Sequence, residues 1–214
     1  RMYYRAGGYG SIIASAFSCD GMVWKEERGE RIGLLSGRGL LRLDSPTIVA
    51  GPDGSVAMYF AGHDGRRWRL FTSSSRDGLN WQGVQLCLEQ SSDPSCGNLK
   101  DPCLVDMLPQ RRLYCVESGD GGSYIATATE VPDGGFGPLL RCKGYECDGF
   151  YPRNPSVVAL QDGQQRMYFS EYPHGTVIGS RVVSAISLDG VNWQRETGVR
   201  ISPGGEWDRH GSFC

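Results

Sequence analysis

Four acidic side chains stand at recurring places in the sequence and could together carry acid–base chemistry. Asp44 and Asp101 lie in Asp-Ser-Pro and Asp-Pro segments, and Glu117 and Glu171 each stand three residues after a tyrosine in a short apolar segment. Hydrolysis of a glycosidic bond generally needs two carboxyl groups, one to protonate the leaving oxygen and one to activate water or attack the sugar. The candidate catalytic residues are therefore Asp44, Asp101, Glu171 and Glu117.

Basic and polar side chains accompany these carboxylates. Guanidinium groups bind carboxylate and phosphate oxygens in bidentate pairs, so the cluster could hold a phosphate or a sugar carboxylate. The same cations could instead neutralise the aspartates, which would make the cluster a set of paired structural charges. The candidate substrate-binding residues are Arg5, His63, Lys100, Arg153, Asn154, Asp208, Arg209 and His210.

No metal or cofactor is predicted from the sequence. The three histidines, His63, His174 and His210, match no zinc-binding spacing. Cys142 and Cys147 lack a second cysteine pair that would complete a zinc site. We therefore expect any chemistry to depend on the side chains alone.

A repeat of about 55 residues must position these side chains. The turn motif Ser-x-Asp-Gly-x-x-Trp recurs at Asp20, Asp77 and Asp189, at intervals of 57 and 112 residues. The larger interval is twice 56, and Asp133-Gly134 followed by Phe136 stands near its midpoint as a degenerate copy. Two further markers keep step with this turn. They are the strand-like segments beginning at Met2, Met58, Leu113 and Met167, and the prolines Pro46, Pro102 and Pro155.

Each repeat predicts four antiparallel strands, so the chain is predicted to be all-β, a β-propeller of four-stranded blades in one domain spanning 1–214. Asp-Gly suits a tight turn, and the tryptophan after it is expected to fill the gap between blades. The first repeat lacks an inner strand, and the C-terminus is expected to supply it and close the ring, which would hide exposed sheet edges. The predicted repeats are 1–40 plus 207–214, 41–96, 97–150 and 151–206.

These motifs resemble the five-bladed propeller superfamily of arabinanases, levansucrases and invertases, the glycosyl hydrolase family 43 and 32 type. The resemblance covers essentially the whole chain through the Asp-Gly-x-x-Trp hairpins and the Asp-Pro or Asn-Pro inner strands. It implies that Asp44 is the base and that Asp101 orients the substrate and tunes the acid. The next inner strand starts with Arg153-Asn154, so only Glu117 or Glu171 could serve as the general acid. Four repeats depart from the family's five: either four blades close the ring, or one blade is absent.

Composition limits the other possibilities. A net charge of -2 and a pI near 6.0 give no electrostatic reason to expect nucleic acid or an anionic membrane as partner. No apolar run approaches the roughly 20 residues that span a bilayer, so a soluble chain is expected. The eight cysteines lie singly in the sequence, and we expect most of them to be small buried hydrophobic residues. Pro155 blocks glycosylation at Asn154. An intracellular or organellar reducing compartment is favoured over secretion.

Two functions remain open from the sequence. The first is a glycoside hydrolase-like propeller that hydrolyses or binds a glycoside at the mouth of its channel. The alternative is a non-catalytic propeller that serves as a structural subunit or assembly factor and binds a protein partner. The partners to be distinguished are therefore a carbohydrate and a protein.

Overall fold

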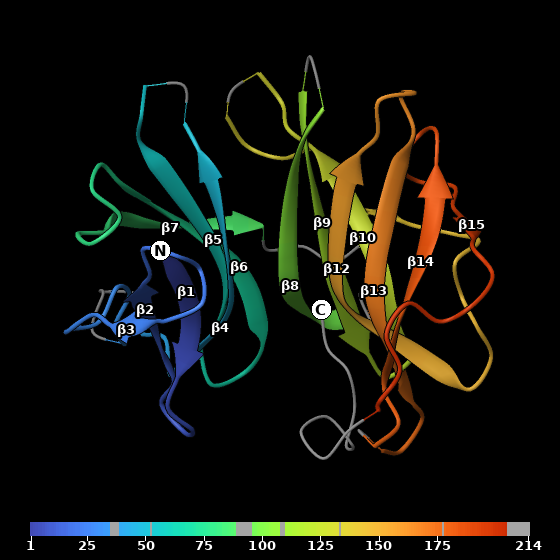
Figure 1. Ribbon diagram of the computed structural model, residues 1–214, viewed down its shortest axis with the longest axis horizontal. Helices are drawn as coiled ribbons and strands as arrows, with labels where there is room; N and C mark the ends of the chain where they lie inside the picture. Colours follow the sequence, from blue (N-terminus) through green and yellow to red (C-terminus); the bar gives the residue numbers. More distant parts are fainter. Residues whose placement is uncertain are drawn as a thin grey trace. The chain divides into compact units, whose positions relative to one another are not determined.

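The computed structural model of the chain is built from β-strands joined by turns and loops (Figure 1). It describes residues 1–34, 39–51, 53–88, 96–107, 110–132, 134–176 and 178–204. Every regular element in these residues is a strand, and every strand pairing within the sheets is antiparallel. Among them, no helix is long and apolar enough to cross a membrane. The prediction of an all-β chain of antiparallel blades is confirmed.

The strands form four sheets, numbered here as blades 1 to 4 in chain order, in two compact units. Unit 1 comprises Arg1–Glu89, with a three-stranded blade 1 and a four-stranded blade 2. Blade 1 consists of β1 (Met2–Ala6), β2 (Ile12–Phe17) and β3 (Lys25–Glu26). Blade 2 consists of β4 (Arg42–Ala50), β5 (Val56–His63), β6 (Trp68–Ser75) and β7 (Gln82–Leu88).

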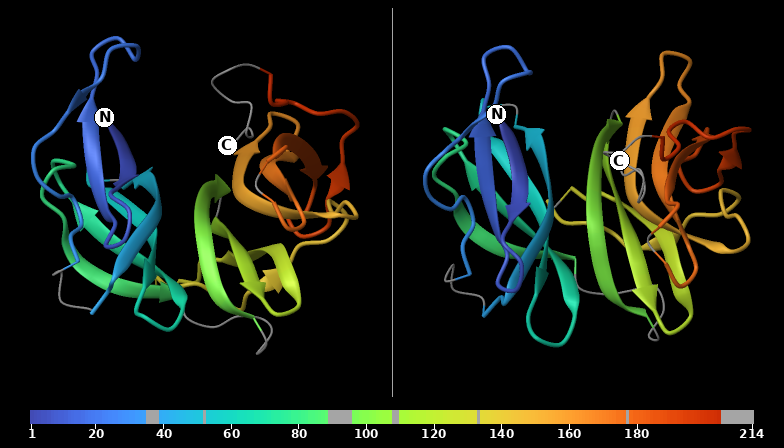
Figure 2. Two further views of the ribbon diagram at one scale, coloured as in Figure 1. Left: turned by 90° about the horizontal axis from the view of Figure 1, so that it is seen from below. Right: turned by 60° about the horizontal axis from the view of Figure 1, so that its bottom comes forward.

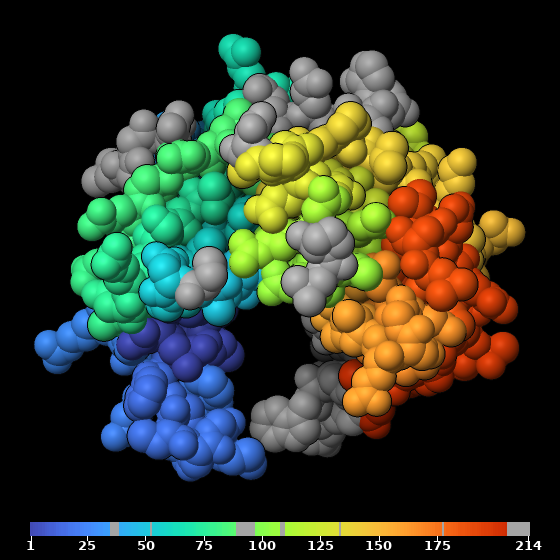
Figure 3. Space-filling view, turned by 90° about the horizontal axis from the view of Figure 1, so that it is seen from above, coloured from blue at the N-terminus to red at the C-terminus, as the bar shows by residue number. Residues whose placement is uncertain are grey.

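Unit 2 comprises Gln90–Cys214 and contains two four-stranded blades, which lie side by side in Figures 2 and 3. Their inner strands β8 and β12 pack against each other, so the two sheets share a core. Blade 3 consists of β8 (Cys96–Met107), β9 (Gln110–Gly119), β10 (Gly122–Thr129) and β11 (Leu140–Arg141). Blade 4 consists of β12 (Phe150–Ala159), β13 (Gln165–Pro173), β14 (Arg181–Ser187) and β15 (Gln194–Arg195).

The Asp-Gly motif forms a tight turn between the last two strands of blades 1, 2 and 4. In blade 4 the Asp189 carboxylate accepts hydrogen bonds from the backbone N–H groups of Val191 (2.8 Å) and Asn192 (2.7 Å). Gly190 adopts a φ of 74°, which a side chain would disfavour. Asp20 and Asp77 accept the equivalent bonds in blades 1 and 2. Asp133, in the degenerate copy, lies outside the described residues.

A repeated contact joins the two blades of each unit at this turn. In unit 2 the Tyr114 ring of β9 meets Trp193 edge-on, with 5.9 Å between centroids, and its hydroxyl lies 3.2 Å from the Gly190 carbonyl oxygen. In unit 1, Tyr3 of β1 meets Trp81 edge-on at 5.5 Å and donates to the Gly78 carbonyl at 2.8 Å. We call each of these contacts a turn latch. The predicted role of the tryptophan between blades therefore fits Trp81 and Trp193.

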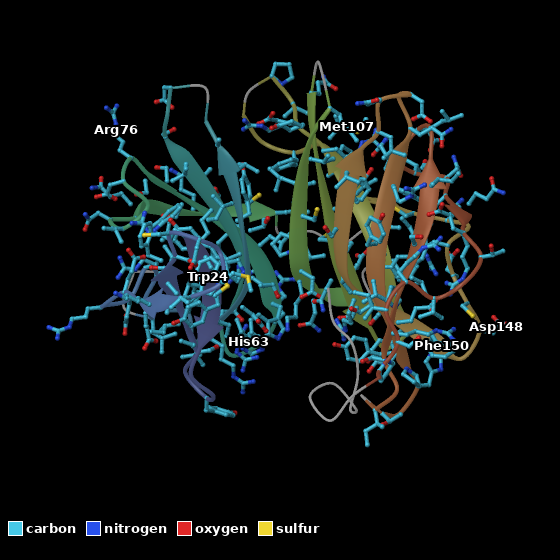
Figure 4. All side chains as sticks on the ribbon, in the orientation of Figure 1. Trp24, His63, Arg76, Met107, Asp148 and Phe150 are labelled. Atoms are coloured by element: carbon cyan, nitrogen blue, oxygen red, sulfur yellow. The ribbon has the colours of Figure 1, made fainter. Side chains whose placement is uncertain are left out.

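Trp24 departs from that prediction. Its side chain lies in blade 1 and is 41% exposed (Figure 4). The inner strand that 207–214 was expected to add to blade 1 lies outside the described residues, so ring closure stays a prediction. The same holds for the assignment of 1–214 to one domain.

The cysteines are less buried than expected. Of the eight cysteines, the structure describes six as free, and two of these six, Cys115 and Cys142, are buried. Burial raises the pKa of the Cys142 thiol to about 12, which makes it an inert packing group at neutral pH. The expectation that most cysteines are buried is wrong for the described ones, because the others lie on strand faces or turns that remain partly open to solvent.

Candidate functional site

The prolines of the inner strands mark β-bulges that re-aim the preceding side chains. The strand register shifts between Asp44 and Thr47, between Lys100 and Cys103, and between Arg153 and Ser156. Proline cannot donate to the ladder, and bulges commonly redirect side chains near functional sites. The residue before each proline has a positive φ, which is uncommon for a non-glycine residue. These residues are Ser45 (51°), Asp101 (53°) and Asn154 (49°).

The bulges show that Asp44 and Asp101 are not equivalent positions. Asp44 stands two residues before its proline, as Lys100 and Arg153 do, whereas Asp101 stands one residue before its proline, as Asn154 does. These residues also lie inside their strands, because β4, β8 and β12 begin earlier, at Arg42, Cys96 and Phe150. The sequence analysis placed the start of an inner strand at Arg153-Asn154, and this start is corrected to Phe150. The presence of the proline alone did not show this one-residue difference in register.

In unit 1, Asp44 lies close to Arg5. Their closest side-chain atoms, Arg5 Nη1 and Asp44 Oδ2, are 3.6 Å apart, and the Asp44 side chain is 15% exposed. Asp44 Oδ1 also accepts a hydrogen bond from the Ser45 N–H at 2.9 Å. His63 lies at the end of β5, opposite Arg42, and its ring packs against Trp68. Unit 1 thus brings one predicted carboxylate and one predicted cation together.

In unit 2, Asp101 joins the two inner strands. Its side chain is buried, and Asp101 Oδ2 accepts a hydrogen bond from the backbone N–H of Asn154 at 3.3 Å. Cys103 accepts a similar bond from Val157, so two side chains of β8 reach the backbone of β12. Asp101 is therefore engaged in holding blade 3 to blade 4.

Glu171 is held by two arginines that the sequence analysis did not single out. Its side chain is 2% exposed, and Glu171 Oε2 accepts hydrogen bonds from Arg195 Nη2 (2.9 Å) and Arg181 Nε (3.0 Å). Arg195 Nη1 donates to the other carboxylate oxygen and to the Tyr145 carbonyl. The hydrogen bond to Glu171 raises the pKa of the Arg195 guanidinium above its ordinary value. The cavity beside Glu171 has a volume of only about 40 Å³.

Glu117 occupies the equivalent place in β9 and is fully buried. Its backbone pairs with Leu99 of β8 and Tyr124 of β10, in the middle of blade 3. The corresponding positions in unit 1 are Ala6 and Gly62, so both glutamates belong to unit 2. A substrate would have to displace covering atoms to reach Glu117.

A cleft of about 630 Å³ opens between blades 3 and 4. It is bordered by the β9–β10 turn, the beginning of β12 and the residues that follow β13, and Figure 4 labels Phe150 on this border. The Tyr151 ring stacks with Tyr172 (centroids 5.7 Å apart, 18° between planes) and with His174 (5.9 Å, 23°). The lining includes Asn98, Asp120, Tyr124, Arg141, Phe150, Tyr151, Arg153 and His174.

The cleft contains one residue that the sequence predicted as substrate-binding, Arg153. Sequence reasoning missed Arg141 and Tyr151, and it considered His174 only in the search for a zinc-binding spacing, which found none. No repeat marker reaches these positions, because they lie in strand ends and connections that differ between blades. Among the described residues, no group of three or more His, Cys, Asp and Glu side chains could hold a metal ion. Asp208, Arg209 and His210 lie outside the described residues.

Comparisons with known proteins bear on the fold. No family model and no curated protein sequence matches the chain. Among solved structures, an N-acetylgalactosamine deacetylase from F. plautii, solved with blood group B trisaccharide, is similar with a TM-score of 0.68 and 17% identity. That alignment covers 92% of this chain and 63% of the deacetylase, so the chain spans less than two thirds of that protein's length.

Two hydrolases are also similar in structure to this chain at low sequence identity. A Bacillus subtilis arabinanase has a TM-score of 0.71 and 14% identity, over 97% of this chain and 78% of its own. A family 32 β-fructofuranosidase from Bombyx mori has a TM-score of 0.74 and 11% identity, over 93% of this chain and 46% of its own. The chain therefore has the glycoside hydrolase-like β-propeller fold that its motifs predicted. At these identities the likeness concerns the fold alone.

Proposed function

We propose that this chain is a carbohydrate-binding propeller of the glycoside hydrolase-like type, which binds a glycoside in the cleft between blades 3 and 4. The observation that carries the proposal is the cleft itself. Its volume of about 630 Å³ lies within the range of about 300–1,000 Å³ common for small-molecule sites. It combines aromatic rings with a few polar side chains, the mixture typical of such sites. Similar folds in an arabinanase and a β-fructofuranosidase support a carbohydrate as the ligand class.

Binding is favoured over hydrolysis because each predicted carboxylate is engaged or covered. Glu171 has guanidinium donors on both oxygens, and Glu117 has no exposed surface. A general acid must come within hydrogen-bond reach of the leaving oxygen, about 2.6–3.2 Å or through one water. The small cavity beside Glu171 has room for about one water molecule and not for a sugar ring.

The test is a glycan array followed by calorimetry on the oligosaccharides that bind. We expect Tyr151→Leu to weaken binding about tenfold or more, because the aromatic ring face of the cleft is lost. The matched control is Tyr9→Leu. Tyr9 is 93% exposed in unit 1 and also has an arginine over its ring, with Arg42 Cζ 4.0 Å from the centroid. Tyr9→Leu should leave the affinity unchanged.

Several outcomes would overturn the proposal. If no glycan binds, or if both tyrosine variants bind as the unmodified protein does, the cleft is not the carbohydrate site. If the chain releases reducing sugar from a bound oligosaccharide and Asp101→Asn abolishes that release with folding intact, the protein is a hydrolase. A stable co-purifying protein with no glycan bound would favour the assembly role instead.

A further inference from the structure

The charged residues of the cleft are mostly basic. Among the described residues that line it, Arg141, Arg153 and His174 are basic and Asp120 is the one acid. Arg141 lies at the end of β11, Arg153 at the bulge of β12, and His174 directly after β13. Three separate segments thus direct basic groups to one cleft. A neutral ligand would not require this.

The two guanidinium groups are available to a ligand. Within the part of the chain that the structure describes, neither Arg141 nor Arg153 forms an ion pair or a side-chain hydrogen bond. Each instead lies over an aromatic ring: Arg141 Cζ is 4.0 Å from the Tyr124 centroid, and Arg153 Cζ is 5.4 Å from that of Tyr151. Such stacking holds the planar group in place through its face and leaves its N–H edge for hydrogen bonds.

Other arginines of unit 2 are committed to carboxylates. Arg166 donates to Glu196 at 3.0 Å, and Arg111 donates to Asp106 at 2.7 Å. Arg181 and Arg195 both bind Glu171. Among the described arginines of unit 2, those that line the cleft thus differ from these four in having no carboxylate partner.

We propose that the cleft recognises an acidic carbohydrate, with the carboxylate of a uronic acid bound by Arg153 and Arg141 beside the aromatic surface of Tyr151. The proposal rests on the proposed function and specifies the ligand class of the same site. A carboxylate has the planar pair of oxygens that matches the fork of N–H donors of a guanidinium group. Asp120, in the β9–β10 turn that borders the cleft, has the same sign of charge as such a ligand and would weaken its binding.

The experiment compares charged and uncharged forms of the same sugar chain. The probes are tetramers of galacturonate, mannuronate and glucuronate, each as the free acid and as the methyl ester, measured by calorimetry at fixed ionic strength. We expect at least one acid to bind about tenfold or more tightly than its ester, since charge-assisted hydrogen bonds to a carboxylate are about twice as strong as those to an uncharged group. Arg153→Gln should remove that difference, and Arg153→Lys should restore only part of it.

Two further variants act as controls. Arg76→Gln removes the same charge from an exposed position in unit 1 that does not line the cleft (Figure 4), and the acid should bind to it as before. Asp120→Asn should strengthen binding of the acid and leave binding of the ester unchanged. An equal effect of Arg76→Gln and Arg153→Gln would point to net charge alone and contradict the proposal.

The outcomes separate this inference from the proposed function. Equal binding of acids and esters, with no effect of Arg153→Gln, would overturn the acidic-ligand proposal and leave carbohydrate binding in place. Failure of every glycan, neutral or charged, would overturn both proposals together.

Discussion

Units 1 and 2 repeat the same scaffold contact but differ in what their inner strands carry. Both have a turn latch in which a tyrosine meets the next blade's tryptophan and lies within hydrogen-bond distance of the Asp-Gly carbonyl. An arginine two residues before the tyrosine donates to the carbonyl of the turn aspartate in each case, from Arg1 to Asp77 at 2.8 Å and from Arg112 to Asp189 at 2.6 Å. The latch is therefore a property of the repeat.

The chemistry is unequal between the units. Unit 2 holds the two buried glutamates, the arginines that bind Glu171 and the cleft with its unpaired guanidinium groups. Unit 1 has alanine and glycine at the glutamate positions. Its predicted site residues Arg5 and Asp44 form an ion pair with 3.6 Å between the closest atoms. The repeated residues therefore explain how blades assemble, whereas the residues that vary between blades determine what can be bound.

The turn glycines give the strongest test of the latch. A Cβ at Gly190 would lie 2.3 Å from Arg112 Nη1 and 2.5 Å from the Tyr114 hydroxyl, and at Gly78 2.5 Å from the Tyr3 hydroxyl. Gly190→Ala should destabilise the protein by about 2–4 kcal/mol, because the strain of a left-handed alanine adds to broken hydrogen bonds. Gly78→Ala should cost less, since Tyr3 is only half-buried. Urea unfolding measures both.

Gly21→Ala is the matched control. Gly21 occupies the same turn in blade 1 with a φ of 76°, and nothing lies within 4 Å of its Cβ position. Only the backbone strain of about 1–2 kcal/mol should remain. If all three variants lose the same stability, the latch contacts contribute nothing measurable and the two units do not share a stabilising device.

Removal of the tyrosine hydroxyl from each turn latch should show which of the two latches stabilises the protein more. Tyr114 is fully buried, and its hydroxyl donates to Gln165 Oε1 at 2.6 Å as well as facing Gly190. Tyr114→Phe leaves Gln165 Oε1 buried without this donor and should cost about 1–3 kcal/mol, whereas the Gly190 carbonyl keeps its hydrogen bond from Trp193 Nε1. Tyr3→Phe should cost about 0.5–1.5 kcal/mol, because water can replace the lost donor at a half-buried site. A larger loss in Tyr3→Phe would reverse the proposed ranking of the two latches.

The sequence predicted the fold well because the fold depends on residues that recur. The Asp-Gly turns, the Met-Tyr strands and the tryptophans each perform one local task, so their spacing alone indicates a four-stranded blade. Trp24 is the exception: the sequence shows the same motif, but its exposure depends on neighbours that the motif does not specify.

The site was less predictable because its residues interact across neighbouring strands and across blades. Asp101 was noticed for its Asp-Pro motif, yet its bond to the Asn154 N–H depends on the bulge geometry of two strands. Arg195 and Arg181 gave no sequence signal of their pairing with Glu171, since they come from different strands of blade 4. Tyr151 and Arg141 likewise become a cleft only when blades 3 and 4 pack together.

The hydrogen bonds of the turn aspartates should make stability depend on pH, and this smaller effect should be alike in both units. The side-chain and backbone hydrogen bonds from Asn192 hold the pKa of Asp189 well below its ordinary value, and the backbone N–H of Asn80 does the same for Asp77. A carboxyl whose pKa is lowered by folding contributes stability above its unfolded pKa of about 3.9, and this contribution is lost as the pH falls through the folded value. Asp189→Ala and Asp77→Ala should therefore be less stable than the unmodified protein at pH 7, and the differences should narrow below about pH 4.

The measurement is the urea midpoint between pH 7 and pH 2, with Asp148→Ala as the control for loss of an exposed carboxylate. Asp148 is exposed in unit 2 (Figure 4), and its variant should follow the unmodified protein at every pH. Because the same turn bonds recur in blades 2 and 4, the two turn variants should shift over the same pH range. A shift in only one of them would mean that burial around the latch, and not the turn itself, controls the ionisation of the aspartate.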